Sequence, residues 1–178
     1  NKAIFIFTPS YHPLPRTKFW LKGINILISR IADAVVSLSK MENTILQKDY
    51  HVPNYKQHII HWGANSLPTR EKEPDAKQVT ILCVGRLGKH KGQHWLIDTY
   101  NKASAKFTSP SRLILAGGYE GNISLLEQAA GNMGPNNQII FTGELDDEQL
   151  SKWYARSDIF VLFSRYEAFG LVYFEAML

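Results

Sequence analysis

The sequence of 178 residues has a single cysteine, Cys83, so no disulfide bridge can form within the chain. Cys83 stands in the apolar run "VTILCVG", where a lone cysteine is usually a small buried hydrophobic residue. No apolar run approaches the roughly 20 residues that a membrane-spanning helix needs. The first residues show no secretory signal pattern, although a removed or missing N-terminus stays open because the chain begins at Asn1. These features favour a reducing, cytoplasmic location.

Acidic residues are scarce in the first part of the chain. Residues 1–70 hold nine Lys and Arg residues against three acidic ones, a net charge of +6. The other residues hold eleven against thirteen, a net charge of −2, which together gives the +4 of the whole chain. This asymmetry favours two units with different partners. A basic surface suits anionic lipid, an acidic substrate or nucleic acid, and a merely solvated basic face is an equal alternative.

The second part of the chain alternates apolar runs with amphipathic segments. Such alternation predicts parallel strands joined by helices that cover both faces of the sheet. Asp146 with Gln149 three residues later predicts a capping box at the start of one helix. We therefore expect an α/β fold with Rossmann-like, doubly wound parallel sheets and flanking helices. The predicted strands are 79–85, 111–118, 137–143 and 158–164, and the predicted helices lie near 93–107, 122–132 and 147–157.

The first part of the chain shows a similar alternation in fewer elements. A stretch with two prolines, six charges and almost no apolar residues separates it from the second part, as expected of an interdomain linker. We predict a first domain over 1–66, a linker over 67–78 and a second domain over 79–178. The elements predicted in the first part are strands at 4–7, 34–39 and 57–62 and helices at 17–31 and 40–50.

Ligands of doubly wound sheets bind at the carboxyl ends of the strands, and the first such end in the second domain is "GRLGKHKG". Gly85 allows the backbone to approach a ligand closely. Arg86 and Lys91 combine a guanidinium fork with an ammonium charge beside a helix start, which suits a phosphate or diphosphate. A solvated basic turn is an equal alternative, and we expect Lys89 and His90 to be exposed.

The next two strand ends carry glycines and acidic residues. Gly117 and Gly118 could admit a ligand, although a simple tight turn is the commoner reason for such a pair. The backbone of Glu144 and Leu145 lies where a flat base could rest. We expect Asp146–Asp147 to cap and charge a helix start, and we predict no metal site.

The last strand end leads through "SRYEAFGLVYFEAML" into a helix. The first amides of this helix, after Gly170, would carry partial positive charge and could donate to phosphate or sugar oxygens. Glu167 and Glu175 could each accept hydrogen bonds from vicinal hydroxyl groups, because a carboxylate has two acceptor oxygens. Taken singly, Glu167 has the alternative of an acid at a helix N-terminus, and Glu175 has the alternative of a surface glutamate.

These motifs, taken in order, resemble those of the retaining glycosyltransferases of group 1, which have the GT-B fold. The matching pieces are G-R-L-x3-K-G, A-G-G, F-x-G-x-L and the E-x7-E motif with F-G inside it, and they run from Val79 to Leu178. The glutamate pair alone would be a weak match, whereas the whole series is specific. The resemblance implies an enzyme that moves a hexose from a nucleoside-diphosphate sugar, with UDP or GDP, to an acceptor with retention of configuration.

The resemblance also implies roles for individual residues. Arg86 and Lys91 would clamp the donor diphosphate and neutralise the leaving group, and Glu167 would hold hydroxyl groups of the donor sugar. Glu175 would bind the ribose. No cofactor or metal ion is implied. Further substrate contacts are expected at Gly85, Gly117, Gly118, Glu144, Leu145, Ser164, Phe169, Gly170 and Leu171.

The first part resembles the end of the N-terminal domain of that family. His12, in "TPSYHP", would lie in a loop near the acceptor, and a structural role near the hinge is the slightly favoured alternative. The family more often has Pro-Asn-Gly where this chain has His61-Trp62-Gly63, which puts contacts at the crossover in question. Since both domains are shorter than those of the family, we expect the chain to be incomplete in both.

Three functions remain open at the level of sequence. The leading one is the donor-binding part of a glycosyltransferase. A module that binds nucleotide sugars without catalysis is the second, and a related chemistry such as nucleotide-sugar epimerisation is the third. The expected partners are a nucleotide sugar and a glycan or lipid-linked acceptor, with peripheral contact at the inner face of a membrane as a minor hypothesis and no nucleic acid.

Overall fold

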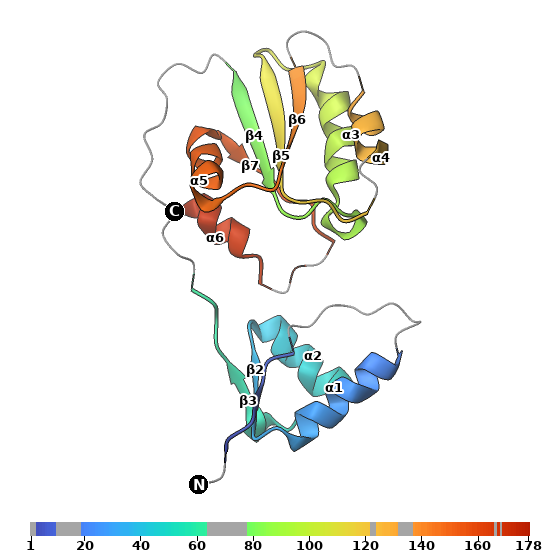
Figure 1. Ribbon diagram of the computed structural model, residues 1–178, viewed down its shortest axis with the longest axis vertical. Helices are drawn as coiled ribbons and strands as arrows, with labels where there is room; N and C mark the ends of the chain where they lie inside the picture. Colours follow the sequence, from blue (N-terminus) through green and yellow to red (C-terminus); the bar gives the residue numbers. More distant parts are fainter. Residues whose placement is uncertain are drawn as a thin grey trace. The chain divides into compact units, whose positions relative to one another are not determined.

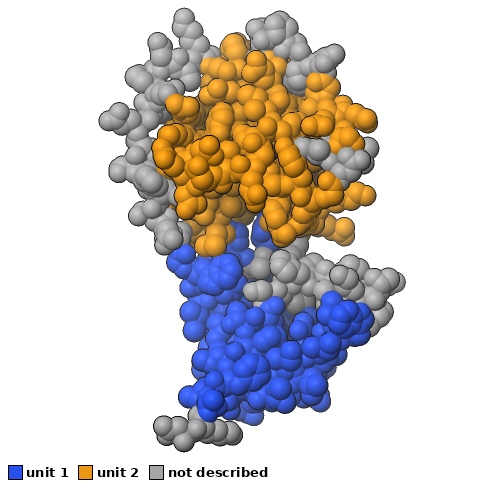
Figure 2. Space-filling model, in the orientation of Figure 1, with its two compact units in different colours: residues 1–63, 166–170 blue, residues 64–165, 171–178 orange. Residues whose placement is uncertain are grey.

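The computed structural model shows two compact units, each built on a parallel sheet (Figure 1). By their contacts, residues 1–63 and 166–170 form the first unit, and residues 64–165 and 171–178 form the second (Figure 2). The structure describes residues 3–9, 19–63, 78–121, 124–131, 137–165, 167 and 169–178.

The first unit contains a three-stranded parallel sheet in the order β1-β2-β3. The predicted strands and helices are present, but the strands are shorter than predicted. The strand predicted over 34–39 ends at Ser37, because Ser39 already caps the next helix. The elements are β1 (Ile6–Phe7), α1 (Phe19–Ile31), β2 (Ala34–Ser37), α2 (Lys40–Tyr50), the 3-10 helix η2 (Asn54–Lys56) and β3 (Gln57–Ile59).

Helix α2 is held against this sheet by a cap and by apolar packing. The Glu42 amide donates to the Ser39 hydroxyl at 3.1 Å, which satisfies one of the open amides of the first turn. The buried Glu42 carboxylate accepts a hydrogen bond of 2.6 Å from the Leu38 amide. Leu46 and Tyr50, one turn apart on α2, pack with residues of β2 in the core of this unit.

The second unit is the more extensive and has a four-stranded parallel sheet in the order β6-β5-β4-β7. The order shows that the chain crosses from one side of β4 to the other, which is the arrangement of a doubly wound sheet. The elements are β4 (Val79–Val84), the 3-10 helix η3 (Lys89–Lys91), α3 (Gln93–Ser104), β5 (Ser111–Ala116), α4 (Ser124–Ala130), β6 (Asn137–Gly143), α5 (Asp147–Arg156), β7 (Ile159–Phe160) and α6 (Leu171–Met177).

Helices cover both faces of this second sheet, as Figure 1 shows. Successive side chains of a strand point to opposite faces, so alternate residues of β4 enter different cores. Cys83 packs in the cluster that contains α3 residues, and Leu82 packs in the cluster that contains Tyr154 of α5. The predicted α/β fold with parallel sheets and flanking helices is therefore confirmed.

Strand β7 departs most from the sequence-based expectation, since the predicted seven residues, 158–164, shorten to Ile159–Phe160. It pairs only with β4, in the register Ile81 with Ile159 and Leu82 with Phe160. One more backbone bond follows, from the Val161 amide to the Leu82 carbonyl oxygen at 2.8 Å. Beyond it the chain leaves the sheet edge and runs toward the start of α3, so the apolar residues that follow are not part of a ladder.

Helix α5 begins as the sequence predicts. The Gln149 amide donates to the Asp146 carboxylate at 2.8 Å, and the Asp146 amide donates to the Gln149 side chain at 3.2 Å. This reciprocal pair is the predicted capping box. Asp146 therefore has the structural role that was expected of it.

Two further expectations concern segments at the limits of the described residues. The predicted linker, 67–78, lies outside them except for Gln78, and its boundaries stay a prediction. Among the helices of the described residues, none combines the length and the apolar character that a membrane crossing requires.

Candidate functional site

The loop that follows β4 is shaped by glycines and a short 3-10 helix. Gly85 has φ +148° and Gly92 has φ +73°, conformations that other residues rarely adopt. A Cβ atom on Gly92 would overlap the carbonyl oxygen of Phe163, which follows β7. Gly92 therefore allows the start of α3 to contact the chain that leaves β7.

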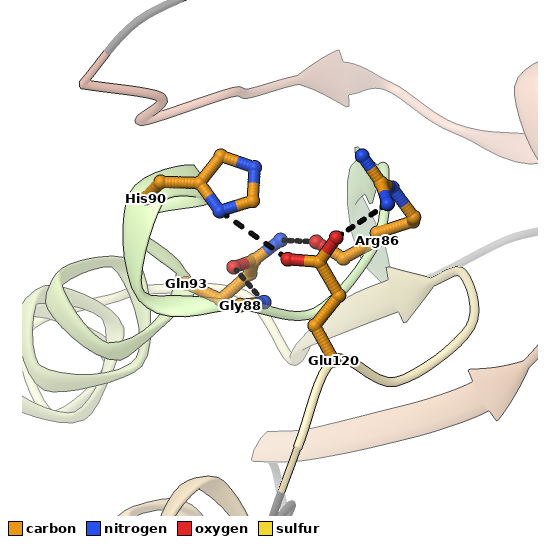
Figure 3. Close-up of polar contacts among 5 residues, drawn as sticks. All are labelled: Arg86, Gly88, His90, Gln93 and Glu120. Atoms are coloured by element: carbon orange, nitrogen blue, oxygen red, sulfur yellow. Dashed lines mark hydrogen bonds and ion pairs between the residues drawn. The ribbon is translucent and has the colours of Figure 1, made fainter. Parts of the chain in front are cut away.

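A buried side chain fixes the shape of this loop (Figure 3). Gln93, the first residue of α3, is only 1% exposed. Its side chain donates to the Arg86 carbonyl oxygen at 3.0 Å and accepts from the Gly88 amide at 3.3 Å. Because both ends of the amide are satisfied, Gln93 holds the backbone on each side of Leu87 in one conformation.

The loop after β5 continues the sheet pairing alongside the loop after β4. The Leu87 amide donates to the Gly118 carbonyl oxygen at 2.8 Å, and the Glu120 amide donates to the Leu87 carbonyl oxygen at 2.9 Å. A Cβ atom on Gly117, which has φ +146°, would overlap the Gly85 carbonyl oxygen. The absence of a side chain at Gly117 thus permits its backbone to approach that of Gly85 closely.

The end of β6 joins the same edge of the sheet. The Gly117 amide donates to the Gly143 carbonyl oxygen at 2.9 Å. The carboxylate of Glu144 lies beside Gly118, 3.5 Å from where a Cβ atom would stand. The side chain of Leu145 packs against the core beneath α5 and α6, so only its backbone remains for the predicted contact with a base.

The chain after β7 is also linked to the loop after β4. The Arg165 amide donates to the His90 carbonyl oxygen at 2.9 Å, and Phe163 lies against Gly92. Ser164, a predicted substrate contact, lies between these two anchoring points and is half-buried. The four strand ends singled out in the sequence are therefore connected along one edge of the second sheet.

The two predicted cations occupy different positions on the loop after β4. The Arg86 guanidinium is mostly exposed and pairs with the Glu120 carboxylate at 2.5 Å. Lys91 is half-buried and lies close enough to Cys83 for its charge to act on that thiol. Burial raises the pKa of the Cys83 thiol from 9.0 to about 12, and the Lys91 charge partly opposes the rise.

A thiol with this pKa remains protonated at neutral pH and is a poor nucleophile. We expect Cys83 in the folded protein to resist an aromatic disulfide reagent at pH 8, and one thiol per chain to react after unfolding in denaturant. Absorbance of the released thiolate measures both. The variant Lys102→Cys, which adds a cysteine at an exposed position of α3, should react at once in the folded state. Equally fast reaction of Cys83 would contradict its burial.

Glu175, the predicted ribose contact, lies on α6 and is held by a residue of α5. The nearly buried Tyr154 hydroxyl donates to Oε2 of Glu175 at 2.8 Å. The same hydroxyl lies 3.4 Å from the Val172 carbonyl oxygen, one turn earlier on α6. Tyr154 thus fixes the direction of the Glu175 carboxylate.

Phe169, which lies shortly before α6, contacts two aromatic residues of the first unit. Phe169 stacks on the His61 ring, with centroids 6.0 Å apart and planes 26° apart, and meets Trp62 edge-on with centroids 6.5 Å apart. Glu167 and Gly170 belong to the same segment and are half-buried and buried, respectively. The unusual His61-Trp62 pair therefore makes an aromatic contact to the F-G step of the E-x7-E motif.

Sequence reasoning missed three residues of this edge: Glu120, Gln93 and Tyr154. The quoted string "AGGYEG" contains Glu120, but nothing in the string indicates that its carboxylate meets Arg86. The predicted acceptor-side residue His12 lies outside the described residues. The roles predicted for individual residues stay predictions, while their places along the sheet edge are observed.

A model of the family described as "Glycosyl transferases group 1" matches residues 68–178. The chain belongs to this family. The match covers the second sheet and all four of its strand ends, which carry the motifs recognised in the sequence.

Similar proteins and solved structures agree with this assignment. The chain is 28% identical to mannosylfructose-phosphate synthase of Agrobacterium fabrum over 169 residues, and 27% identical to O-antigen chain mannosyltransferase B of Escherichia coli over 187 residues. These matches cover 85% and 98% of the chain, but 37% and 48% of the relatives.

Among solved structures, the crystal structure of Anabaena Alr3699/HepE in complex with UDP and glucose matches with a TM-score of 0.77 and 22% identity. The match covers 97% of this chain and 50% of the Anabaena chain. The crystal structure of WaaG, a glycosyltransferase involved in lipopolysaccharide biosynthesis, matches with a TM-score of 0.67 and 16% identity, over 98% of this chain and 54% of that one. Both support the GT-B fold, and the chain spans about half the length of these proteins.

Proposed function

We propose that this chain supplies the donor-binding part of a glycosyltransferase that moves a hexose from a nucleoside-diphosphate sugar to a glycan, lipid or small-molecule acceptor. The proposal includes retention of the anomeric configuration. The observation that carries it is the joined edge of four strand ends that bears Arg86 and Lys91, in a chain of the group 1 family. This edge is where doubly wound sheets bind their ligands.

Arg86 and Lys91 are assigned to the leaving diphosphate. The loop that carries them is pinned by Gln93 and by the backbone bonds of Leu87, so little of its backbone has to move when a ligand binds. Charges held in advance stabilise the negative charge that develops on a leaving group at little cost in reorganisation. The proposal takes this charge from the protein and needs no metal ion or other cofactor.

Glu175 is assigned to the ribose and Glu167 to hydroxyl groups of the donor sugar. A carboxylate can accept one hydrogen bond at each oxygen from a pair of neighbouring hydroxyls. Tyr154 supports this assignment for Glu175, since it holds the carboxylate from the side of α5. A surface glutamate without a function would gain little from such a buried partner.

The names of the relatives suggest which donors to test first. Two of the relatives described above carry mannose in their names, and a third is a GDP-mannose-dependent mannosyltransferase of Mycolicibacterium smegmatis, 26% identical over 114 residues. The solved Anabaena protein instead holds UDP and glucose. Binding of GDP, UDP and their sugars, measured by calorimetry, tests the proposal directly, and failure to bind any of them would refute it.

The variants Glu175→Ala and Tyr154→Phe test the ribose contact. We expect Glu175→Ala to weaken binding of the preferred nucleoside diphosphate about tenfold or more, because a charged hydrogen-bond acceptor is lost. Tyr154→Phe should weaken binding by about three- to tenfold, since the carboxylate loses its orienting donor. Calorimetry measures both changes.

Tyr100→Phe is the matched control for Tyr154→Phe. It removes the hydroxyl of another buried tyrosine in the same unit, one that bonds to the Ser111 hydroxyl at 2.8 Å on the opposite face of the sheet. Both changes should lower the free energy of unfolding by about 1 kcal/mol. Only Tyr154→Phe should weaken nucleotide binding, and an equal effect of the two variants would remove Glu175 from the binding site.

A further inference from the structure

Glu120 is placed by the backbone beside the predicted diphosphate clamp. Its amide donates to the Leu87 carbonyl oxygen, and Leu87 itself is bonded to Gly118, so the loops after β4 and β5 run side by side at this point. Leu87 is buried and follows Arg86 directly. The paired backbone of the two loops thus holds Glu120 close enough to Arg86 for their side chains to meet.

The carboxylate of Glu120 bridges two basic residues of the loop (Figure 3). Oε1 lies 2.5 Å from Nη1 of Arg86, and Oε2 lies 3.4 Å from Nδ1 of His90. A Cβ atom at Gly88 would stand 2.7 Å from Oε2, so the glycine leaves room for the carboxylate over the loop. Together these contacts place the negatively charged Glu120 carboxylate on the face of the loop that carries Arg86.

The pair is accessible to a ligand. The side chain of Arg86 is 67% exposed, and that of Glu120 is 34% exposed. An ion pair with this exposure contributes little to stability, because solvent screens both charges. A diphosphate carries more charge than a carboxylate and can form bidentate bonds with a guanidinium. Exchange of one anion for the other at Arg86 is therefore energetically easy.

We propose that Glu120 is an internal counter-anion, which holds the Arg86 guanidinium between turnovers and competes with the nucleoside diphosphate for it. This inference rests on the proposed function, in which Arg86 binds the donor diphosphate. The competition lowers affinity for the nucleoside diphosphate, which is also the product that must leave the site. Because product release limits the turnover of many transferring enzymes, a residue that weakens product binding favours turnover.

The variant Glu120→Gln tests the competition. It keeps the size of the side chain and removes its charge, so we expect the preferred nucleoside diphosphate to bind about two- to fivefold more tightly. The corresponding nucleoside monophosphate should gain less, because its single phosphate has less charge to place at Arg86. Isothermal calorimetry with UDP, GDP and the two monophosphates, on the full chain at low ionic strength, measures these differences. Glu120→Ala should show the same direction of change.

The control Asp98→Asn removes the same charge at an exposed ion pair of α3, with Lys102 at 2.7 Å. It should leave nucleotide affinity within the error of the measurement. If Asp98→Asn strengthens binding as much as Glu120→Gln, the effect is one of net charge, and the proposed competition is refuted. Weaker binding by Glu120→Gln would also overturn it, since Glu120 would then support the ligand or orient Arg86.

The double variant Arg86→Ala/Glu120→Gln separates this inference from the function on which it rests. In the Arg86→Ala background the substitution of Glu120 should no longer strengthen binding, because the residue for which the anions compete is gone. If Arg86→Ala alone leaves diphosphate affinity unchanged, the assignment of Arg86 in the proposed function fails. If Arg86→Ala weakens binding but Glu120→Gln is neutral in both backgrounds, only the competition fails.

Discussion

Replacing Arg86 by alanine is expected to lower turnover of the donor sugar by a factor of about 10²–10³. The guanidinium is assigned to the leaving diphosphate, where negative charge grows as the sugar departs. Its loop backbone is already fixed by the buried Gln93 side chain, so only the Arg86 side chain has to exchange Glu120 for the diphosphate. The loss should therefore appear mainly in kcat, measured by release of the nucleoside diphosphate in the complete enzyme.

Two companion variants sharpen this prediction. Lys102→Ala removes a positive charge from an exposed position of α3, where the lysine pairs with Asp98, and it should leave turnover within about twofold. Arg86→Lys keeps the charge and loses the planar fork, so it should recover part of the activity. Transfer by Arg86→Ala at the rate of the unmodified enzyme would exclude Arg86 from the leaving-group site.

The second large effect is expected from Gly117→Ala, on stability. Gly117 has φ +146°, and an added Cβ atom would overlap the carbonyl oxygen of Gly85. The strained backbone costs about 1–3 kcal/mol, and the overlap with a neighbouring backbone costs about 1–3 kcal/mol more. The free energy of unfolding should fall by the sum of the two, about 2–6 kcal/mol, measured by urea unfolding of the chain.

Gly85→Ala provides a closely matched control for this prediction. Gly85 has nearly the same backbone angle, φ +148°, but no heavy atom lies within 4 Å of its added Cβ atom. The free energy of unfolding of Gly85→Ala should therefore fall only by the contribution of backbone strain, about 1–3 kcal/mol. Equal losses from the two variants would show that the loops after β4 and β5 are not packed as closely as the structure has them.

The elements of the second unit could largely be predicted from local patterns in the sequence. The apolar runs of β4 and β5 are buried on both faces, as is typical of parallel strands that helices cover on both sides. The capping box of α5 needs only Asp146 and Gln149, three residues apart, so it too is visible in the sequence. The apolar runs and the capping box each depend on residues that lie within a few positions of one another in the sequence.

The end of β7 shows where local patterns fail. Residues 158–164 are apolar enough for a full strand, but the strand has one neighbour, β4, and leaves it after two residues to meet Gly92. Phe169 also contacts His61 and Trp62, more than a hundred positions earlier in the chain. No pattern within the segment encodes such partners.

The sequence by itself determined the α/β class of this protein, its parallel strands and the family motifs at four strand ends, because each of these depends on composition and spacing over short stretches. Only the tertiary structure decided which side chains meet. Glu120 pairs with Arg86 because the loops after β4 and β5 are bonded side by side. Tyr154 pairs with Glu175 because α5 packs against α6. The physical reason is that a side chain's partner depends on where the backbone places both residues, which spacing along the chain does not specify.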